Sequence, residues 1–166
     1  MAEDFVKVEG LKNVEKMLVE LGPALGFKAL RSGLMAASRP MFVAAKANAI
    51  GTGLAGHDSD AMGAAMSRGT RKDTPNRTTL WIGPKNKHKK AIAIYNAYHG
   101  TNLKRLPYFH LVEWGATRGE KGNMAAQPFM RPAFAATAPL VVSNLGREIG
   151  KAIDKVKLKH AGLRKQ

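Results

Sequence analysis

Residues 108–115 (YFHLVEWG) place a single acidic side chain, Glu113, between Val112 and Trp114. Apolar neighbours disfavour the charged form of a carboxyl group, so this placement could raise the pKa of Glu113 and let it act as an acid. General acid–base work by paired carboxylates needs a partner, and no second carboxylate stands beside Glu113 in the sequence. An ion pair or a subunit contact is therefore the better interpretation of this residue.

Residues 51–56 (GTGLAG) match the G-x-G-x-x-G pattern of dinucleotide-binding loops. That chemistry needs a buried strand before the loop, a helix after it and an acid about twenty residues further on. Here an alanine-rich segment of helical character precedes the glycines. We interpret the pattern as a helix end followed by a loop.

Residues 57–60 (HDSD) carry side chains that can bind a metal, but a site needs three or four ligands at workable spacing. Ser and Asp are also favoured helix N-caps, so we interpret the run as the cap of a short helix over about 59–67. The other histidines are scattered, there is no cysteine, and no G-x-S-x-G elbow occurs. The sequence therefore predicts no enzyme, no metal site and no cofactor.

Basic side chains are concentrated in residues 68–105, where Asp73 is the only acid. Lys and Arg contact nucleic-acid phosphates irrespective of sequence, and the interleaved Trp81, Tyr95 and Tyr98 could stack on bases. A solvated loop, or a surface that fits an acidic protein, explains the same composition. The candidate contacts to DNA or to an acidic surface are Lys85, Lys87, Lys89 and Lys90.

Charge is also the outlier of the overall composition. In 166 residues, Lys plus Arg is 27 and Asp plus Glu is 12, a formal net charge of +15. Such a balance favours polyanions or acidic protein surfaces as partners. The first residues lack the apolar core of a signal peptide, and no window reaches the roughly 18 apolar residues of a membrane span. We expect a soluble chain that stays in the compartment where it is made, with no membrane partner.

Hydrophobic periodicity predicts helices at both ends of the chain. Helical spacing runs from Leu11 to Leu21 and again over about 23–50, where Pro40 should kink or divide the helix. From about Arg131 apolar residues recur in steps of three and four, which indicates a long C-terminal helix to residue 156.

Sequence patterns predict a short strand before the first helix, at residues 5–10, and two more between the N-terminal and C-terminal helices, at residues 78–83 and 108–114. Loops are expected over 51–79, apart from the short helix, and over 115–127, while 91–99 fits either a strand or a short helix. The predicted fold class is α+β, with a small antiparallel sheet packed against long N-terminal and C-terminal helices. We expect a single domain over 1–156 and a basic, flexible C-terminal tail over 157–166.

The most specific pattern joins residues 108–115 to residues 126–134 (AQPFMRPAF) across a short loop. Together they resemble the motif pair Y-x-x-[FLV]-V-E-[FWY]-G and [AP]-x-P-F-[LM]-R-P-A of the lambdoid phage gene-product-ten-like family of small tail-completion or neck proteins. In outline the likeness covers most of the chain, from residues 8–11 (VEGL) to the C-terminal helix. Residues 51–54 (GTGL) match the family's D-T-G-x-L segment only in part. The insert over about 85–105 is longer and more basic than expected for a member of this family.

This resemblance implies a structural virion protein that assembles rather than catalyses. Copies would form a ring, hexameric to match tail symmetry, that joins the tail to the head connector around the DNA channel. Expected partners are the head connector, the tail-tube or terminator proteins and phage DNA in the lumen. The protein would be made and assembled in the host bacterial cytoplasm and would be located in the tail or neck of the virion. The expected interface residues are Glu113, Trp114, Phe129 and Arg131.

The motif residues also have expected structural roles. Gly115 lets the chain turn, Pro132 suits the first turn of the last helix, and Phe129 and Met130 anchor the return in the core. Arg131 is expected to pair with Glu113. The alternative is a non-specific DNA-binding protein that uses the basic region 68–105, whereas a hydrolase or nuclease is disfavoured by the lack of carboxylate and histidine clusters.

Overall fold

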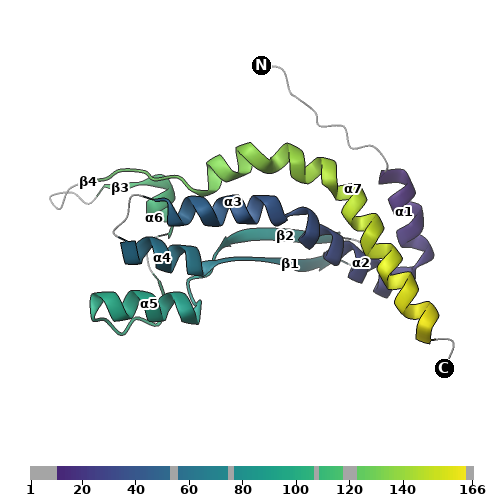
Figure 1. Ribbon diagram of the computed structural model, residues 1–166, viewed down its shortest axis with the longest axis horizontal. Helices are drawn as coiled ribbons and strands as arrows, with labels where there is room; N and C mark the ends of the chain where they lie inside the picture. Colours follow the sequence, from purple (N-terminus) through teal and green to yellow (C-terminus); the bar gives the residue numbers. More distant parts are fainter. Residues whose placement is uncertain (1–10, 53–55, 75–76, 107–108, 118–122, 164–166) are drawn as a thin grey trace, which may run out of the picture. The chain divides into compact units, whose positions relative to one another are not determined.

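A computed structural model describes residues 11–52, 56–74, 77–106, 109–117 and 123–163 (Figure 1). The protein is mainly helical, with a small two-stranded antiparallel sheet and a long C-terminal helix, so the predicted α+β class is confirmed. The strand predicted over residues 5–10 lies outside the described residues. None of the described helices is both long enough and apolar enough to cross a membrane.

Residues 11–50 form three helices, separated where the sequence predicts breaks. Helix α1 (Leu11–Glu20) gives way to α2 (Gly22–Ala37) at Gly22, whose positive φ of 75° suits glycine. Between α2 and α3 (Arg39–Ile50), the Ser38 N–H donates to Leu34 O at 3.0 Å. Pro40 follows in the first turn of α3, where its missing N–H leaves no intrahelical bond unmade.

The middle of the chain holds more regular structure than the loop predicted over 51–79. Helix α4 (Gly56–Ala65) confirms the short helix but begins earlier, so residues 57–60 form its first turn rather than a cap before it. Strand β1 (Met66–Thr74) pairs with β2 (Arg77–Pro84), the strand expected at 78–83. The loop prediction is wrong for β1, because its sequence MSRGTRKDT is polar and lacks the alternation that marks a half-buried strand.

Two short segments that were ambiguous or misjudged by pattern are helices. Residues 91–99 lie in α5 (Lys89–His99), which ends at Gly100 with φ of 59°. The strand predicted over 108–114 is wrong, since α6 (Phe109–Trp114) is helical. Its buried residues Phe109, Val112 and Glu113 lie three and four positions apart, the spacing of one helical face.

The C-terminal return and helix follow the prediction in outline. The base of the predicted loop carries a short antiparallel pair, β3 (Ala116–Thr117) with β4 (Asn123–Met124). Helix α7 (Met130–Leu163) continues past the predicted start of the flexible tail at residue 157. Val156 is buried and Lys157 Nζ lies 3.4 Å from Glu20 Oε2, contacts that hold this end of the helix in place.

The chain forms two compact units, which we call the terminal unit and the central unit. The terminal unit consists of Met1–Pro40, Gly69–Trp81 and Ala138–Gln166, and the central unit of Met41–Arg68 and Ile82–Thr137. Each unit has its own hydrophobic core. The single domain expected over 1–156 stays a prediction.

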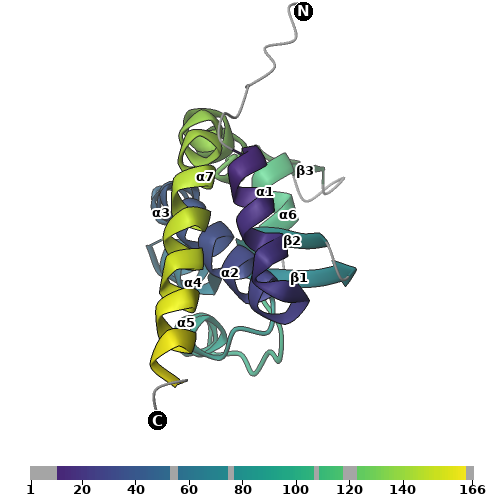
Figure 2. The same ribbon diagram turned by 90° about the vertical axis from the view of Figure 1, so that its right-hand side faces the viewer.

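The terminal unit is a bundle of α1, α2 and the C-terminal part of α7, which lie side by side (Figures 1 and 2). Its core contains Ala29, Ile149 and Ile153. Gly33 permits the close approach of α2 to α7, because a Cβ there would lie 2.6 Å from Ile149 Cα. Small residues of the alanine-rich segment thus set the packing distance.

The central unit packs α3, α4, α5, α6 and the start of α7 around Phe129, which is 1% exposed. Helices α4 and α5 lie against each other, and Asp58 of α4 accepts a bond from His99 of α5 at 2.7 Å. The Asn48 side chain of α3 donates to Phe129 O at 3.1 Å. These contacts give the motif a rigid support.

Candidate functional site

The motif predicted from sequence folds into one continuous site, formed by α6, the β3–β4 base and the first turn of α7. Gly115 turns the chain with φ of 77°, and a Cβ there would lie 2.9 Å from Met124 O, so only glycine fits. The Gln127 N–H donates to Val112 O at 2.8 Å and ties the return to α6. As predicted, Pro132 lies in the first turn of α7.

Glu113 is the centre of this site. Its Oε2 accepts bonds from the backbone N–H groups of Phe129 at 2.8 Å and Met130 at 2.9 Å. Its Oε1 accepts from the Arg131 backbone N–H at 3.1 Å and from Arg131 Nε at 3.2 Å. The predicted ion pair between Glu113 and Arg131 is therefore present, and its carboxylate also caps the N-terminus of α7.

These bonds decide the protonation state of Glu113. Burial raises the pKa of this carboxyl, but the backbone bonds from Met130, Phe129 and Arg131, together with the Arg131 side chain, outweigh it and lower the pKa below its ordinary value. The raised pKa suggested by its aromatic surroundings is wrong. A carboxylate that is held ionised and occupied by four donors stabilises the turn and has no proton to give at neutral pH.

Outward from Glu113, the site presents an exposed aromatic surface. The Arg131 Cζ lies 4.2 Å from the centroid of the Trp114 ring, and Arg131 Nη2 also donates to Glu113 O at 3.0 Å. Trp114 is 67% exposed and Phe134, one turn further along α7, is 61% exposed. We call Trp114, Arg131 and Phe134 the aromatic patch.

The four predicted interface residues therefore come together but divide into two roles. Trp114 and Arg131 are exposed, whereas Glu113 and Phe129 are buried beneath them. Phe134 starts the apolar period that predicts the C-terminal helix, which is the place of a core-facing residue, and its exposure corrects that expectation. It lies three residues after Arg131, on the same face of α7.

A cleft of about 460 Å³ opens beside the aromatic patch. Besides the motif residues, it is lined by Pro84 at the end of β2, by Asn86 in the segment after β2 and by His110 from α6. The Leu106 N–H donates to Asn86 O at 2.8 Å, which fixes one wall. The motif and the segment after β2, far apart in sequence, thus share one surface.

The predicted basic contacts surround the start of α5. Lys85, Lys87, Lys89 and Lys90 are all exposed, and the His88 N–H donates to Lys85 O at 3.1 Å in the turn before the helix. Cations at a helix N-terminus oppose the helix dipole, so these lysines do not stabilise α5. We call them the basic helix start.

Of the aromatic residues interleaved with the basic region, Trp81 belongs to the terminal unit, and Tyr95 and Tyr98 belong to the central unit. Trp81 packs against Gly69, where a Cβ would lie 2.8 Å from the indole ring. Tyr95 is partly buried against the core of the central unit, and Tyr98 is half exposed. The side chains of Lys72 and Arg77 are not among those that the structure describes.

The remaining chemical candidates do not assemble into a site. The Gly51 N–H donates to Ala47 O at 2.9 Å, so this glycine lies at the C-terminal end of α3, as predicted. Residues 53–55 lie outside the described residues. Within the described part of the chain, no group of three or more His, Asp or Glu side chains is placed to hold a metal ion.

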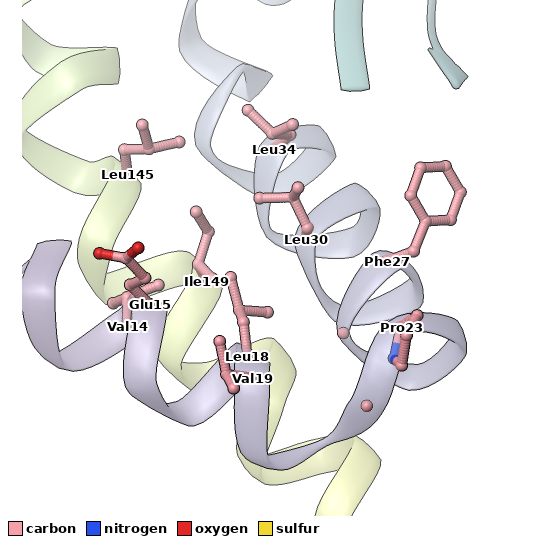
Figure 3. A pocket seen from close by; sticks show the side chains of 12 residues that line it. Val14, Glu15, Leu18, Val19, Pro23, Phe27, Leu30, Leu34, Leu145 and Ile149 are labelled. Carbon is pink, nitrogen blue, oxygen red and sulfur yellow. The ribbon is translucent and has the colours of Figure 1, made fainter. Parts of the chain in front are cut away.

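A second surface, which the sequence did not reveal, is an apolar groove of about 710 Å³ in the terminal unit (Figure 3). Leu30 and Leu34 of α2 face Leu145 and Ile149 of α7, and Leu18 of α1 lies below them. Among the described residues that line the groove, only Glu15 is charged. The periodicity of α1 and α2 indicated which side chains are apolar, but not that a groove remains between the helices.

Comparisons of the chain with protein-family models, with curated proteins and with solved structures found no match.

Proposed function

We propose that this protein is a structural subunit of a bacteriophage virion, a ring-forming tail-completion or neck component that joins the tail to the head connector around the DNA channel. The observation that supports it is the Glu113 carboxylate, which accepts four bonds from the first turn of α7 and thereby fixes an exposed Trp114–Arg131 stack. A buried carboxylate without a free proton suits a scaffold, and an exposed Trp and Arg suit a docking surface.

A closed ring with rotational symmetry needs two different faces on each subunit. The aromatic patch is one such face and the apolar groove of the terminal unit is the other. We assign the patch of one copy to the groove of the next, because the groove is apolar with Glu15 as its charged residue, and the patch carries Arg131 against the Trp114 ring together with an exposed Phe134. Aromatic residues and Arg are enriched in the centres of protein interfaces.

The remaining partners follow from this role. The neighbours along the particle axis would be the head connector on one side and tail-tube or terminator proteins on the other. Phage DNA would pass through the lumen, and the net charge of +15 would attract this polyanion. The protein would act without catalysis or a cofactor and would be located in the virion after assembly in the host cytoplasm.

The direct test is the composition of phage particles. Deleting the gene should yield heads and tails that do not join, visible by negative-stain electron microscopy, and expression of the chain in trans should restore joined particles. Trp114→Ala should fail to restore them, while Tyr98→Ala, which removes a half-exposed aromatic outside the patch, should succeed. Joined, infectious particles that lack this chain would contradict the proposal.

One observation favours a second function, non-specific binding of DNA. The basic helix start places four exposed lysines around a helix N-terminus, where nothing in the helix itself favours them. This function predicts binding to duplex DNA that weakens steeply with salt, by a chain that is absent from purified particles. Presence in the particle therefore separates the two functions.

A further inference from the structure

A second, smaller cleft lies in the terminal unit, between α2 and the C-terminal part of α7. Its volume is about 130 Å³. Ala152 and Val156, which are 8% and 9% exposed, are its apolar floor, and Ser32 contributes a hydroxyl. The other lining residues are three lysines, Lys28, Lys155 and Lys159, together with His160.

The lysines of this cleft differ from their neighbours on the same helix. Lys151 Nζ lies 3.0 Å from Glu148 and Lys157 Nζ lies 3.4 Å from Glu20. By contrast, no acid in the described part of the chain pairs with Lys155 or Lys159, and none of the described residues that line the cleft is acidic. Asp154, the nearest acid in sequence, falls on the opposite side of α7 by the helical period.

Helix stability explains only part of this arrangement. Cations near the C-terminus of a helix interact favourably with its dipole, which accounts for Lys159. Lys155 and Lys159, however, are like charges four residues apart, and such pairs destabilise a helix. Lys28 lies in the first half of α2, where the dipole does not favour it. Helix stability therefore does not explain why these lysines line one cleft.

We propose that this cleft binds phosphate groups of a nucleic-acid backbone. Three ammonium groups and a hydroxyl provide donors and positive charge, and the cleft has room for a phosphate but little more. No aromatic side chain is among the described residues that line it, so bases have nothing to stack on. Binding is therefore independent of base sequence.

A nucleic-acid chain fits the cleft better than a free phosphate ion. Lys155 and Lys159 lie one turn apart, about 6 Å along the helix axis. Such a row of cations can contact more than one phosphate of a continuous chain. Each contact releases counterions that are condensed on the nucleic acid, whereas a free phosphate ion has no such condensed counterions to release. This inference does not depend on ring formation, because the isolated full-length chain carries the whole cleft.

The test compares two triple variants of the full-length chain that lose the same charge. Lys28→Gln, Lys155→Gln and Lys159→Gln together remove the ammonium groups of the cleft, and the control combines Lys16→Gln, Lys46→Gln and Lys151→Gln, which lie outside it. Affinity for a mixed-sequence DNA duplex is measured by fluorescence anisotropy over a series of salt concentrations. The plot of log K against log salt has a negative slope. The cleft variant should reduce the magnitude of this slope by about 3, about 1 for each lysine, and the control should reduce it by much less.

Three further outcomes decide against the proposal. Equal losses in the two triple variants would show that net charge alone matters. Inorganic phosphate, added at constant ionic strength, could bind the wild type but not the cleft variant while the two proteins bind DNA with equal affinity. In that case a free phosphate ion, and not a nucleic acid, would be the ligand of the cleft. Vesicles with anionic headgroups would be the ligand if they alone distinguished the two variants. Circular dichroism melting curves that match the wild type confirm that both variants are folded.

Discussion

At the scale of single residues, Glu113 links the buried structure of the motif to its exposed surface. Its two oxygens satisfy three backbone N–H groups at the start of α7, groups that no residue within the helix can satisfy. The same carboxylate orients Arg131, which in turn covers Trp114. A change at Glu113 therefore acts both on the stability of the central unit and on the geometry of the aromatic patch.

Glu113→Gln keeps the shape of the side chain but removes its charge and part of its accepting capacity. We expect the free energy of unfolding to fall by about 1.5 to 3 kcal/mol, the range for hydrogen bonds to charged groups, as measured by urea denaturation at pH 7. The control is Glu148→Gln, a partly exposed acid at the surface of α7 that pairs with Lys151, whose effect should be far smaller. Equal effects of the two variants would contradict the role given to Glu113.

The same residue predicts a dependence on pH. Because the pKa of Glu113 is lower in the folded chain, the unfolded chain binds more protons as the pH falls, and stability falls with it. The stabilisation by Glu113 is present above its unfolded pKa, about 4.3, and is lost as the pH falls through its folded pKa. The difference in unfolding free energy between the wild type and Glu113→Gln should therefore shrink below about pH 4. A difference that grows on acidification would overturn this assignment.

The residues of the motif were predictable from sequence because each has a local reason. Gly115 needs a positive φ, Pro132 fits a first helical turn, and Glu113 and Arg131 have opposite charges. The exposure of Phe134 was not predictable, because its place in an apolar period resembles that of a core residue. The basic cleft was also hidden, since Lys28 and Lys155 are far apart in sequence and only the packing of α2 on α7 brings them together.

At the scale of elements, helices with long periods were predictable and short segments were not. The breaks at Gly22 and Pro40 follow from backbone chemistry, whatever the rest of the chain does. Helix α6 is only six residues long, and an apolar run of that length fits a strand or a helix equally well. Strand β1 depends on pairing with β2 rather than on its own sequence pattern.

The contact between α2 and α7 yields a test on two glycines. Gly33→Ala would bring a Cβ within 2.6 Å of Ile149 Cα, so the helices must separate, at a cost of about 1 to 3 kcal/mol. Gly150→Ala adds the same methyl group to α7 where nothing lies within 4 Å, and should stabilise the helix by up to about 1 kcal/mol. Thermal melting followed by circular dichroism should show shifts of opposite sign. A neutral Gly33→Ala would mean that the two helices do not pack in this way.

At the scale of the whole molecule, the proposed ring depends on two faces that differ from each other. The groove belongs to the terminal unit and the aromatic patch to the central unit, so blocking one leaves the other intact. Val19 lines the groove and is 76% exposed, and Phe134 of the patch is 61% exposed. Both positions accept a charged side chain without disturbing a core.

This independence makes the assembly testable by mixing. Val19→Arg should block the groove and Phe134→Arg the patch, and each variant alone should sediment as a monomer under conditions in which the wild type assembles. An equimolar mixture should form a heterodimer and nothing larger, because one intact patch can still meet one intact groove, as analytical ultracentrifugation would show. If the interface instead joined identical surfaces, one variant would still self-associate or the mixture would stay monomeric. Either result would exclude the contact proposed between patch and groove.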